Sequence, residues 1–137
     1  MSLWYLDSSA IVKFAVVERE SKALGEWRND LNPGDVLVTC ELAVTEVTRA
    51  VARVEGDIDV ALDHLDALEQ LIIDRNLLRA AGQLHPLTMR SLDAIHLAAA
   101  LALGDDLAGV VTYDERMHDA AHDLGLTTMA PGREPDR

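Results

Sequence analysis

The feature that most constrains this fold is an alternation of short apolar runs with longer segments whose apolar residues recur every three or four positions. The short runs predict strands at 3–6, 36–39, 71–73, 109–112 and 126–129. The longer segments predict helices at 9–17, 20–31, 41–54, 60–71, 76–83, 91–103 and 115–124. Strands that alternate with helices imply right-handed crossovers and a parallel sheet covered on both faces. We therefore predict an α/β fold, a three-layer α/β/α sandwich around a mostly parallel sheet of four or five strands.

A chain of 137 residues is the size of one domain, and no repeat or low-complexity linker divides it. We predict one domain over residues 1–130 and a flexible tail over 131–137. The helices at 41–54 and 60–71 leave two arrangements open, a hairpin that projects from the sheet or a cover for one sheet face. Ser91 is predicted to cap the helix that follows it.

Composition and termini exclude several classes of protein. A hydrophobic share of 49% fits a folded globule, and Cys40, the one cysteine, cannot form an internal disulfide, as suits a reducing compartment. The first residues, MSLWYLD, lack the basic region of a secretion signal. The longest stretch without Asp, Glu, Lys or Arg is the 11 residues 94–104, and a membrane span needs about 20. We expect a cytoplasmic protein with no membrane segment.

The net charge of −12 argues against a protein that coats nucleic acid by bulk attraction. The same acidity favours a basic partner. Much of the positive charge is carried by arginines that could flank a groove for an RNA backbone: Arg49, Arg53, Arg75, Arg79 and Arg90.

Four acidic residues from distant parts of the chain are predicted to meet at one edge of the sheet. Asp7 and Asp114 each follow an apolar strand, and the carboxyl ends of parallel strands share one edge, where ligands collect. Asp93 lies in the first turn of the helix at 91–103, and Glu46 lies in the helix after the second strand. Each also has an ordinary structural interpretation, as a helix cap, a partner of the helix dipole or, for Glu46, an ion pair with Arg49.

A cluster of carboxylates has a chemical consequence. Two like charges ~4 Å apart repel by roughly 4 kcal/mol near a surface, so the cluster must protonate or bind cations. Ligands that are all oxygen favour Mg²⁺, with Mn²⁺ as a substitute, over zinc. A metal-activated water and an anionic substrate point to hydrolysis of a phosphoester.

Four segments carry a resemblance to a known family: WYLDSSAIVKF, the glutamate of ELAVTEVTRA, SLDAIHLAAA and VTYDERMHDAAHDLGL. Over about residues 3–130 the chain resembles PIN-domain proteins, and among them the VapC-like toxins of type II toxin–antitoxin modules. The resemblance implies a PIN-like α/β/α fold, a metal-dependent endoribonuclease that acts on RNA, a homodimer, and a small cognate antitoxin that holds the toxin inactive.

The resemblance also implies roles for individual residues. Asp7 and Asp93 would be the main metal ligands, and Asp114 would help hold the same or a second ion. Glu46 would bind metal through water or orient the attacking water. Hydroxyls that would hydrogen-bond these carboxylates are those of Ser8 and Thr112.

Other residues and other functions stay open at this level. Arg116 lies two residues after Asp114 and could contact RNA or the antitoxin, whereas we interpret His96 as a packing residue. One alternative function is a haloacid-dehalogenase-like phosphatase with Asp7 as nucleophile. That class needs a second aspartate two residues later, where this chain has Ser9. The other alternative is a non-catalytic binding module.

Overall fold

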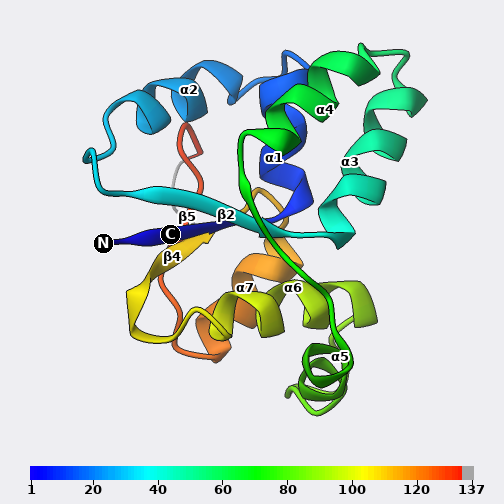
Figure 1. Cartoon of the computed structure of the whole chain (residues 1–137), viewed down its shortest axis with the longest axis vertical. Coiled ribbons are helices and arrows are strands. Elements are labelled where there is room, and N and C mark those ends of the chain that lie inside the picture. The colour runs from blue at the N-terminus through cyan, green and yellow to red at the C-terminus, as the bar shows by residue number, and fades with distance from the viewer. Residues whose placement is uncertain (134–137) are drawn as a thin grey trace.

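The computed structural model describes residues 1–133 and confirms the three-layer α/β/α sandwich around a parallel sheet of five strands. In Figure 1 the sheet crosses the middle of the molecule, with α1 to α4 above it and α5 to α7 below it. The strands are β1 (Leu3–Leu6), β2 (Val36–Cys40), β3 (Glu69–Leu71), β4 (Leu107–Val111) and β5 (Thr128–Met129). The helices are α1 (Ser8–Ala15), α2 (Ser21–Asn29), α3 (Leu42–Arg53), α4 (Ile58–Asp66), α5 (Arg75–Gly82), α6 (Ser91–Leu101), α7 (Glu115–Asp123) and the short 3₁₀ turn η1 (Gly104–Asp106).

The central strand β1 joins two aliphatic cores on opposite faces of the sheet. Successive side chains of a strand point to opposite faces, so Leu6 packs among α1, α3 and α4 while Tyr5 packs among α6 and α7. Both side chains are fully buried. The small residues Ala99 and Ala100 let α6 lie close to this sheet, as part of the lower core.

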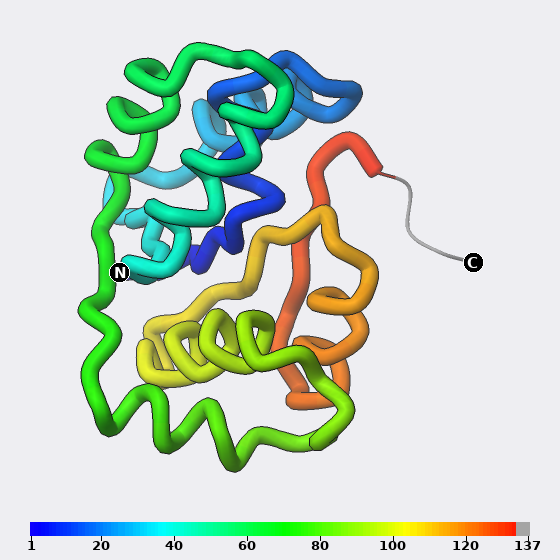
Figure 2. Tube along the Cα trace, turned by 90° about the vertical axis from the view of Figure 1, so that its right-hand side faces the viewer, coloured from blue at the N-terminus to red at the C-terminus, as the bar shows by residue number. Residues whose placement is uncertain are grey.

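The strand order β3-β2-β1-β4-β5 places a switch point between β1 and β4. The chain first builds outward from β1 through β2 to β3, then returns to the other side of β1 to form β4. Figure 2 shows the extended green segment that includes β3 and passes from the upper layer down to α5, after which α5 and α6 lead to β4. A crevice forms where the strand order reverses, at the carboxyl ends of β1 and β4. Asp7 and Asp114 follow these two strands.

The α3–α4 pair covers the upper face of the sheet and does not project from it. Val47 and Val51 of α3 and Leu65 of α4 are buried in the same core as Ile11 of α1. Each Å² of apolar surface that is buried stabilises the fold by roughly 25 cal/mol, and this burial stabilises the docked arrangement. Of the two arrangements that the sequence leaves open, the cover is the one observed.

Two predicted features are wrong in detail. Helix α4 ends at Asp66 and β3 covers Glu69–Leu71, whereas the sequence predicted a helix to residue 71 and a strand at 71–73. Because β3 is an edge strand, it tolerates polar side chains. Ile72 was predicted to lie in this strand because it is apolar, but it follows the strand and is 74% exposed. Ser91 is the first residue of α6 and not its cap; the N-cap position is Arg90, which makes no side-chain cap bond.

The segment after β5 packs back on the domain. The Tyr113 hydroxyl donates to the Pro131 carbonyl at 2.7 Å, and the Arg133 guanidinium donates to the Tyr113 carbonyl. The remainder of the predicted tail, residues 134–137, lies outside the described residues. Within residues 1–133 no helix is long and apolar enough to cross a membrane.

Candidate active site

A recess of about 300 Å³ opens at the carboxyl edge of the sheet, and all four predicted acids line it. Asp7 comes from the end of β1, Asp114 from the end of β4, Asp93 from α6 and Glu46 from α3. Residues separated by up to about a hundred positions thus share one hollow, as the parallel topology predicts. The other residues that line the recess are Ser8, Ser9, Arg90, Ser91, Leu92, His96 and Met117.

Asp7 is held rigidly, with only 3% of its surface exposed. Its Oδ1 accepts from the Ala10 amide at 3.1 Å and from the Ser9 hydroxyl at 2.7 Å, and its Oδ2 accepts from the Thr112 hydroxyl. Burial raises the pKa of Asp7, and the hydrogen bonds from Ser9 and Thr112 oppose that shift. Asp7 is therefore both the N-cap of α1 and a wall of the recess.

Thr112 couples the two aspartates at the switch point. Its hydroxyl donates to Asp7 and accepts from the Asp114 amide at 3.1 Å. Asp114 caps α7, with Oδ1 accepting from the amides of Arg116 at 2.8 Å and Met117 at 3.2 Å. The other carboxylate oxygen of Asp114 is directed toward Arg90.

The Arg90 guanidinium bridges two of the four acids. Its Nε lies 3.2 Å from Oδ2 of Asp93 and one terminal nitrogen lies 3.4 Å from Oδ2 of Asp114. Each contact alone would be a weak surface ion pair. Together they show that the space between Asp93 and Asp114 accommodates positive charge.

Glu46 lies at the partly buried end of a chain of polar contacts. Its Oε1 lies 2.6 Å from the Ser8 hydroxyl and 2.6 Å from Nε2 of His96, and Nδ1 of His96 lies 2.7 Å from the Tyr5 hydroxyl. His96 is 2% exposed, so it is buried as a packing residue would be, but both ring nitrogens make polar contacts. Among residues 1–133, Glu46 forms its ion pair with His96 and not with Arg49.

The electrostatics of this chain favour an ionised Glu46. Burial opposes ionisation, but the hydrogen bonds from His96 and Ser8 outweigh it and lower the pKa of Glu46. Burial likewise opposes protonation of His96, but its contacts with Cys40 and Glu46 raise the pKa of the imidazole to about 10. A protonated His96 thus neutralises the charge of the Glu46 carboxylate through Oε1 and leaves Oε2 for other contacts.

The donor set fits a hard divalent cation. Within residues 1–133 no three His, Cys, Asp or Glu side chains converge closely enough to hold a metal ion as they stand. Glu46 is bonded to His96, and Arg90 lies between Asp93 and Asp114. The acids nevertheless offer only oxygen ligands, as Mg²⁺ prefers, and the Arg90 guanidinium is a stand-in cation between two of them.

Arg116 lies outside the recess. Its side chain is exposed and lines a neighbouring hollow together with Arg90 and Asp93, while only its backbone amide contacts Asp114. Its predicted contact with RNA or an antitoxin therefore stays a prediction.

Three contributors to the recess could not be assigned from the sequence. Ser9 stands next to the predicted pair Asp7–Ser8, which is the one signal that could have identified it. His96 lies one helical turn after Asp93, and this spacing places both on one face of α6. The bridging role of Arg90 depends on how the loop before α6 packs against the end of β4, and no local pattern encodes it.

The fold and the recess define an α/β/α protein with an acid-lined site at the switch point of a parallel sheet. The family model described as "PIN domain" matches residues 4–123. The chain therefore belongs to the PIN domain family.

Within that family the chain is VapC-like. It is 47% identical to Ribonuclease VapC46 of Mycobacterium tuberculosis, in an alignment that covers 96% of this chain and 99% of that protein. It is 36% identical to Ribonuclease VapC47 of the same species, over 93% of this chain and 96% of the relative. Among solved structures, Mycobacterium tuberculosis VapC20, described as a sarcin-ricin loop cleaving toxin, superposes with a TM-score of 0.72 at 13% identity, covering 93% of this chain and 99% of that one. A toxin–antitoxin complex from Klebsiella pneumoniae gives a TM-score of 0.60 at 16% identity, over 83% and 87%.

Proposed function

We propose that this protein is an endoribonuclease, the toxin of a toxin–antitoxin pair, that hydrolyses RNA phosphodiester bonds with Mg²⁺ as cofactor. The observation that carries the proposal is the gathering of four acids in one recess at the switch point. Relatives that share 36–47% of its residues and bear the name ribonuclease support the choice of RNA.

Asp7, Asp93 and Asp114 would hold the cation, with Glu46 contributing directly or through water. Bound there, a divalent ion lowers the pKa of water and stabilises negative charge on phosphate oxygens. Thr112 and Ser9 fix the Asp7 carboxylate by hydrogen bonds, so the fold sets its orientation before substrate arrives.

Glu46 and Arg90 have separate tasks in this proposal. Glu46 is ionised and anchored through one oxygen by Ser8 and His96, so it can orient water and accept its proton. The Arg90 side chain is 54% exposed, so its guanidinium can turn from Asp93 and Asp114 to a phosphate oxygen once a cation neutralises those acids.

The partners follow from charge and family. We propose a small antitoxin with basic character, because a surface of net charge −12 attracts a basic partner. We also propose a homodimer, as the resemblance to VapC-like toxins implies, and a cytoplasmic location, with which the single cysteine, Cys40, is consistent.

The test is cleavage of a mixed RNA pool by the purified protein with Mg²⁺ or Mn²⁺. We expect cleavage that EDTA abolishes and that Asp7→Asn reduces by at least about 100-fold, the scale of damage to a metal site. Asp57→Asn is the matched control, because Asp57 caps α4 in the way that Asp7 caps α1 but lies outside the recess. The control variant should cut RNA at the wild-type rate.

Two outcomes would contradict the proposal. Turnover of a phosphomonoester without RNA cleavage would indicate a phosphatase, although Ser9, which donates to Asp7, stands where that class needs an aspartate. No turnover of either substrate, together with tight binding to a small basic protein, would indicate a non-catalytic module.

A further inference from the structure

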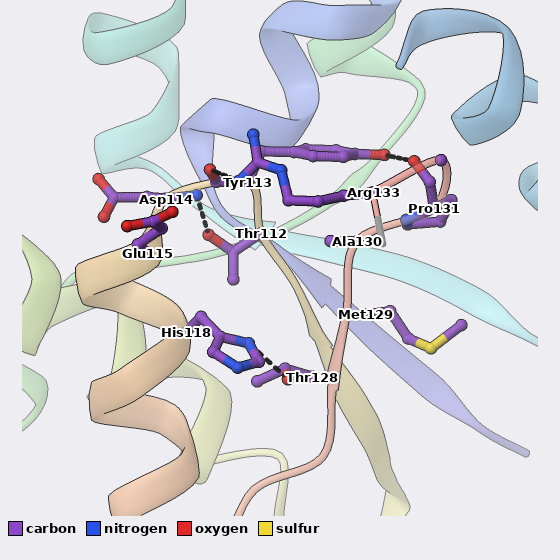
Figure 3. A pocket seen from close by; sticks show the side chains of 11 residues that line it. Thr112, Tyr113, Asp114, Glu115, His118, Thr128, Met129, Ala130, Pro131 and Arg133 are labelled. Carbon is purple, nitrogen blue, oxygen red and sulfur yellow. Dashed lines mark hydrogen bonds between the residues drawn. The ribbon is translucent and has the colours of Figure 1, made fainter. Parts of the chain in front are cut away.

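A second hollow, of about 350 Å³, lies on the other side of Asp114 from the acidic recess. Figure 3 shows it between the first turns of α7, the end of β4, and β5 with the segment that follows it. Asp114 lines both hollows, so the two are neighbours across one side chain. None of the roles described above uses this second hollow, which we call the Thr128 pocket. It is lined by Thr112, Tyr113, Asp114, Glu115, His118, Thr128, Met129, Ala130, Pro131, Gly132 and Arg133.

One wall of the Thr128 pocket is fixed by contacts around the buried Tyr113 ring. Two cations contact the Tyr113 ring, with Lys13 Nζ 4.7 Å and the Arg133 guanidinium carbon 5.4 Å from its centroid. Both cations also contact Glu20, at 2.8 Å for Lys13 and 3.5 Å for Arg133. Arg133 is therefore committed to the wall, and the pocket is formed before any ligand arrives.

The facing walls combine small apolar groups with a few polar groups. In Figure 3, Thr128 and Ala130 point from the last segment toward α7, while Met129 points away, as alternation along an extended chain requires. Nδ1 of His118 lies 2.8 Å from the Thr128 hydroxyl, which fixes the ring. A concave, partly apolar hollow with few oriented polar groups is the usual form of a small-ligand site.

We propose that the Thr128 pocket binds one base of the RNA substrate, the base of a nucleotide next to the scissile phosphate. This inference rests on the proposed ribonuclease function, which places that phosphate in the recess on the other side of Asp114. A base attached through one sugar to that phosphate reaches only an adjacent hollow. A volume of about 350 Å³ accommodates a single flat base.

The polar groups that line the Thr128 pocket determine which bases it can bind. Glu115 repels a phosphate, but its carboxylate can accept hydrogen bonds from the amino groups of bases. The Asp114 carboxylate is already engaged, because one oxygen caps α7 and the other faces Arg90 and the proposed cation site. His118 adds a ring that can contact the face or edge of a base. Adenine, cytosine and guanine carry exocyclic amino groups and uracil does not, so uracil is expected to bind most weakly.

The first experiment measures binding without cleavage. The methyl groups of alanine and threonine are labelled for NMR, and AMP, CMP, GMP or UMP is added to the full chain in EDTA. We expect saturable shifts of the Ala130 and Thr128 methyls with at least one amino-bearing nucleotide, smaller shifts with UMP, and none with ribose 5-phosphate, which has no base. His118→Ala should weaken this binding at least about fivefold, the effect of losing one polar contact.

His122→Ala is the matched control. His122 lies one turn after His118 on α7, with ring centroids 6.5 Å apart and planes within 7°, but it does not line the pocket. The His122→Ala variant should bind nucleotides with the same affinity as the wild type. Equal shifts with ribose 5-phosphate, or shifts only with a basic peptide of antitoxin character, would overturn the base site.

The second experiment separates this inference from the proposed function. A randomised RNA library is cut and the ends are sequenced for wild type, His118→Ala, Ala130→Leu and His122→Ala. We expect a base preference at one position next to the cut that the first two variants lose and His122→Ala keeps. RNA cleavage with no such preference and no methyl shifts would overturn the base site alone. Methyl shifts in a chain that cuts no RNA would overturn the ribonuclease and leave a nucleotide-binding pocket.

Discussion

Asp7 carries two tasks that are usually assigned to different residues. It caps α1 and it lines the recess, and both tasks use the same carboxylate. The raised pKa of Asp7 means that burial makes the ionised form unfavourable in the folded chain. Above its usual pKa the folded protein therefore holds a charge that weakens its stability unless a cation is bound.

Asp7→Asn should consequently fold at least as stably as the wild type in the absence of metal at about pH 7. Asparagine keeps the cap, because its carbonyl oxygen can accept from Ala10 and Ser9 as the carboxylate does. The measurement is a thermal melt in EDTA of both proteins. A variant that melts well below the wild type would show that the charge of Asp7 stabilises the fold.

His96 contacts both Glu46 and Tyr5, and we infer that it positions the Glu46 carboxylate in the recess. If the ribonuclease proposal holds, His96→Ala should lower kcat about 10–100-fold with little change in KM, as loss of an outer partner of a metal site does. His96→Gln, which can still donate to Glu46, should restore part of kcat. Equal kcat in the two variants, with both folded by thermal melt, would reduce His96 to a packing residue.

At the scale of elements, the first two helices are tied by a buried ion pair. Lys13 on α1 and Glu20, directly before α2, lie 2.8 Å apart with about a tenth of each side chain exposed. The Lys13 ammonium holds the pKa of Glu20 below its usual range, although burial opposes that shift. A carboxyl whose folded pKa is lowered contributes stability above its usual pKa and loses it as pH falls.

Glu20→Gln should therefore cost about 1.5–3 kcal/mol of unfolding free energy at about pH 7, the range for a hydrogen bond to a charged group. The difference from wild type should shrink as pH falls below the usual glutamate pKa of 4.5, because the protonated Glu20 carboxyl and the glutamine amide are then both uncharged. Urea unfolding at several pH values measures this difference in unfolding free energy. The control is Glu26→Gln, at an exposed position, which should leave the unfolding free energy unchanged. A difference that does not depend on pH would show that packing, and not charge, is what the substitution removes.

Periodicity predicted the helices well, because a buried face repeats every three or four residues whatever the partner is. It failed at β3, where pairing with β2 on one side makes a strand of Glu69 and Gln70 without an apolar pattern. Asp7 and Asp114 could be predicted because a parallel sheet brings all strand ends to one edge. Arg90 and the His96–Glu46 contact could not, because they depend on side-chain directions across three separate elements.

For the whole molecule, the decisive quantity is a net charge of −12 on a protein proposed to bind a polyanion. Long-range attraction cannot supply the affinity, so it must come from the cation site and a few local contacts such as Arg90. Binding through many lysines and arginines would instead show a steep loss of affinity with salt. The salt dependence of RNA binding therefore distinguishes affinity that comes from the cation site and a few local contacts from affinity that comes from many lysines and arginines.

We expect RNA affinity to depend strongly on Mg²⁺ and weakly on salt. Glu46→Gln, which keeps the three aspartates, allows binding of a short single-stranded RNA to be measured with little cleavage. Two phosphates neutralised by the chain give a slope near −1.4 in a log–log plot, about a sevenfold loss of affinity from about 50 to 200 mM salt. Removal of Mg²⁺ should weaken binding by more than that, whereas Asp57→Asn added to Glu46→Gln, a change outside the recess, should leave both dependences unchanged. A slope of about −4 that persists in EDTA would mean that the arginines form a phosphate-binding surface strong enough to overcome the acidic charge of the molecule.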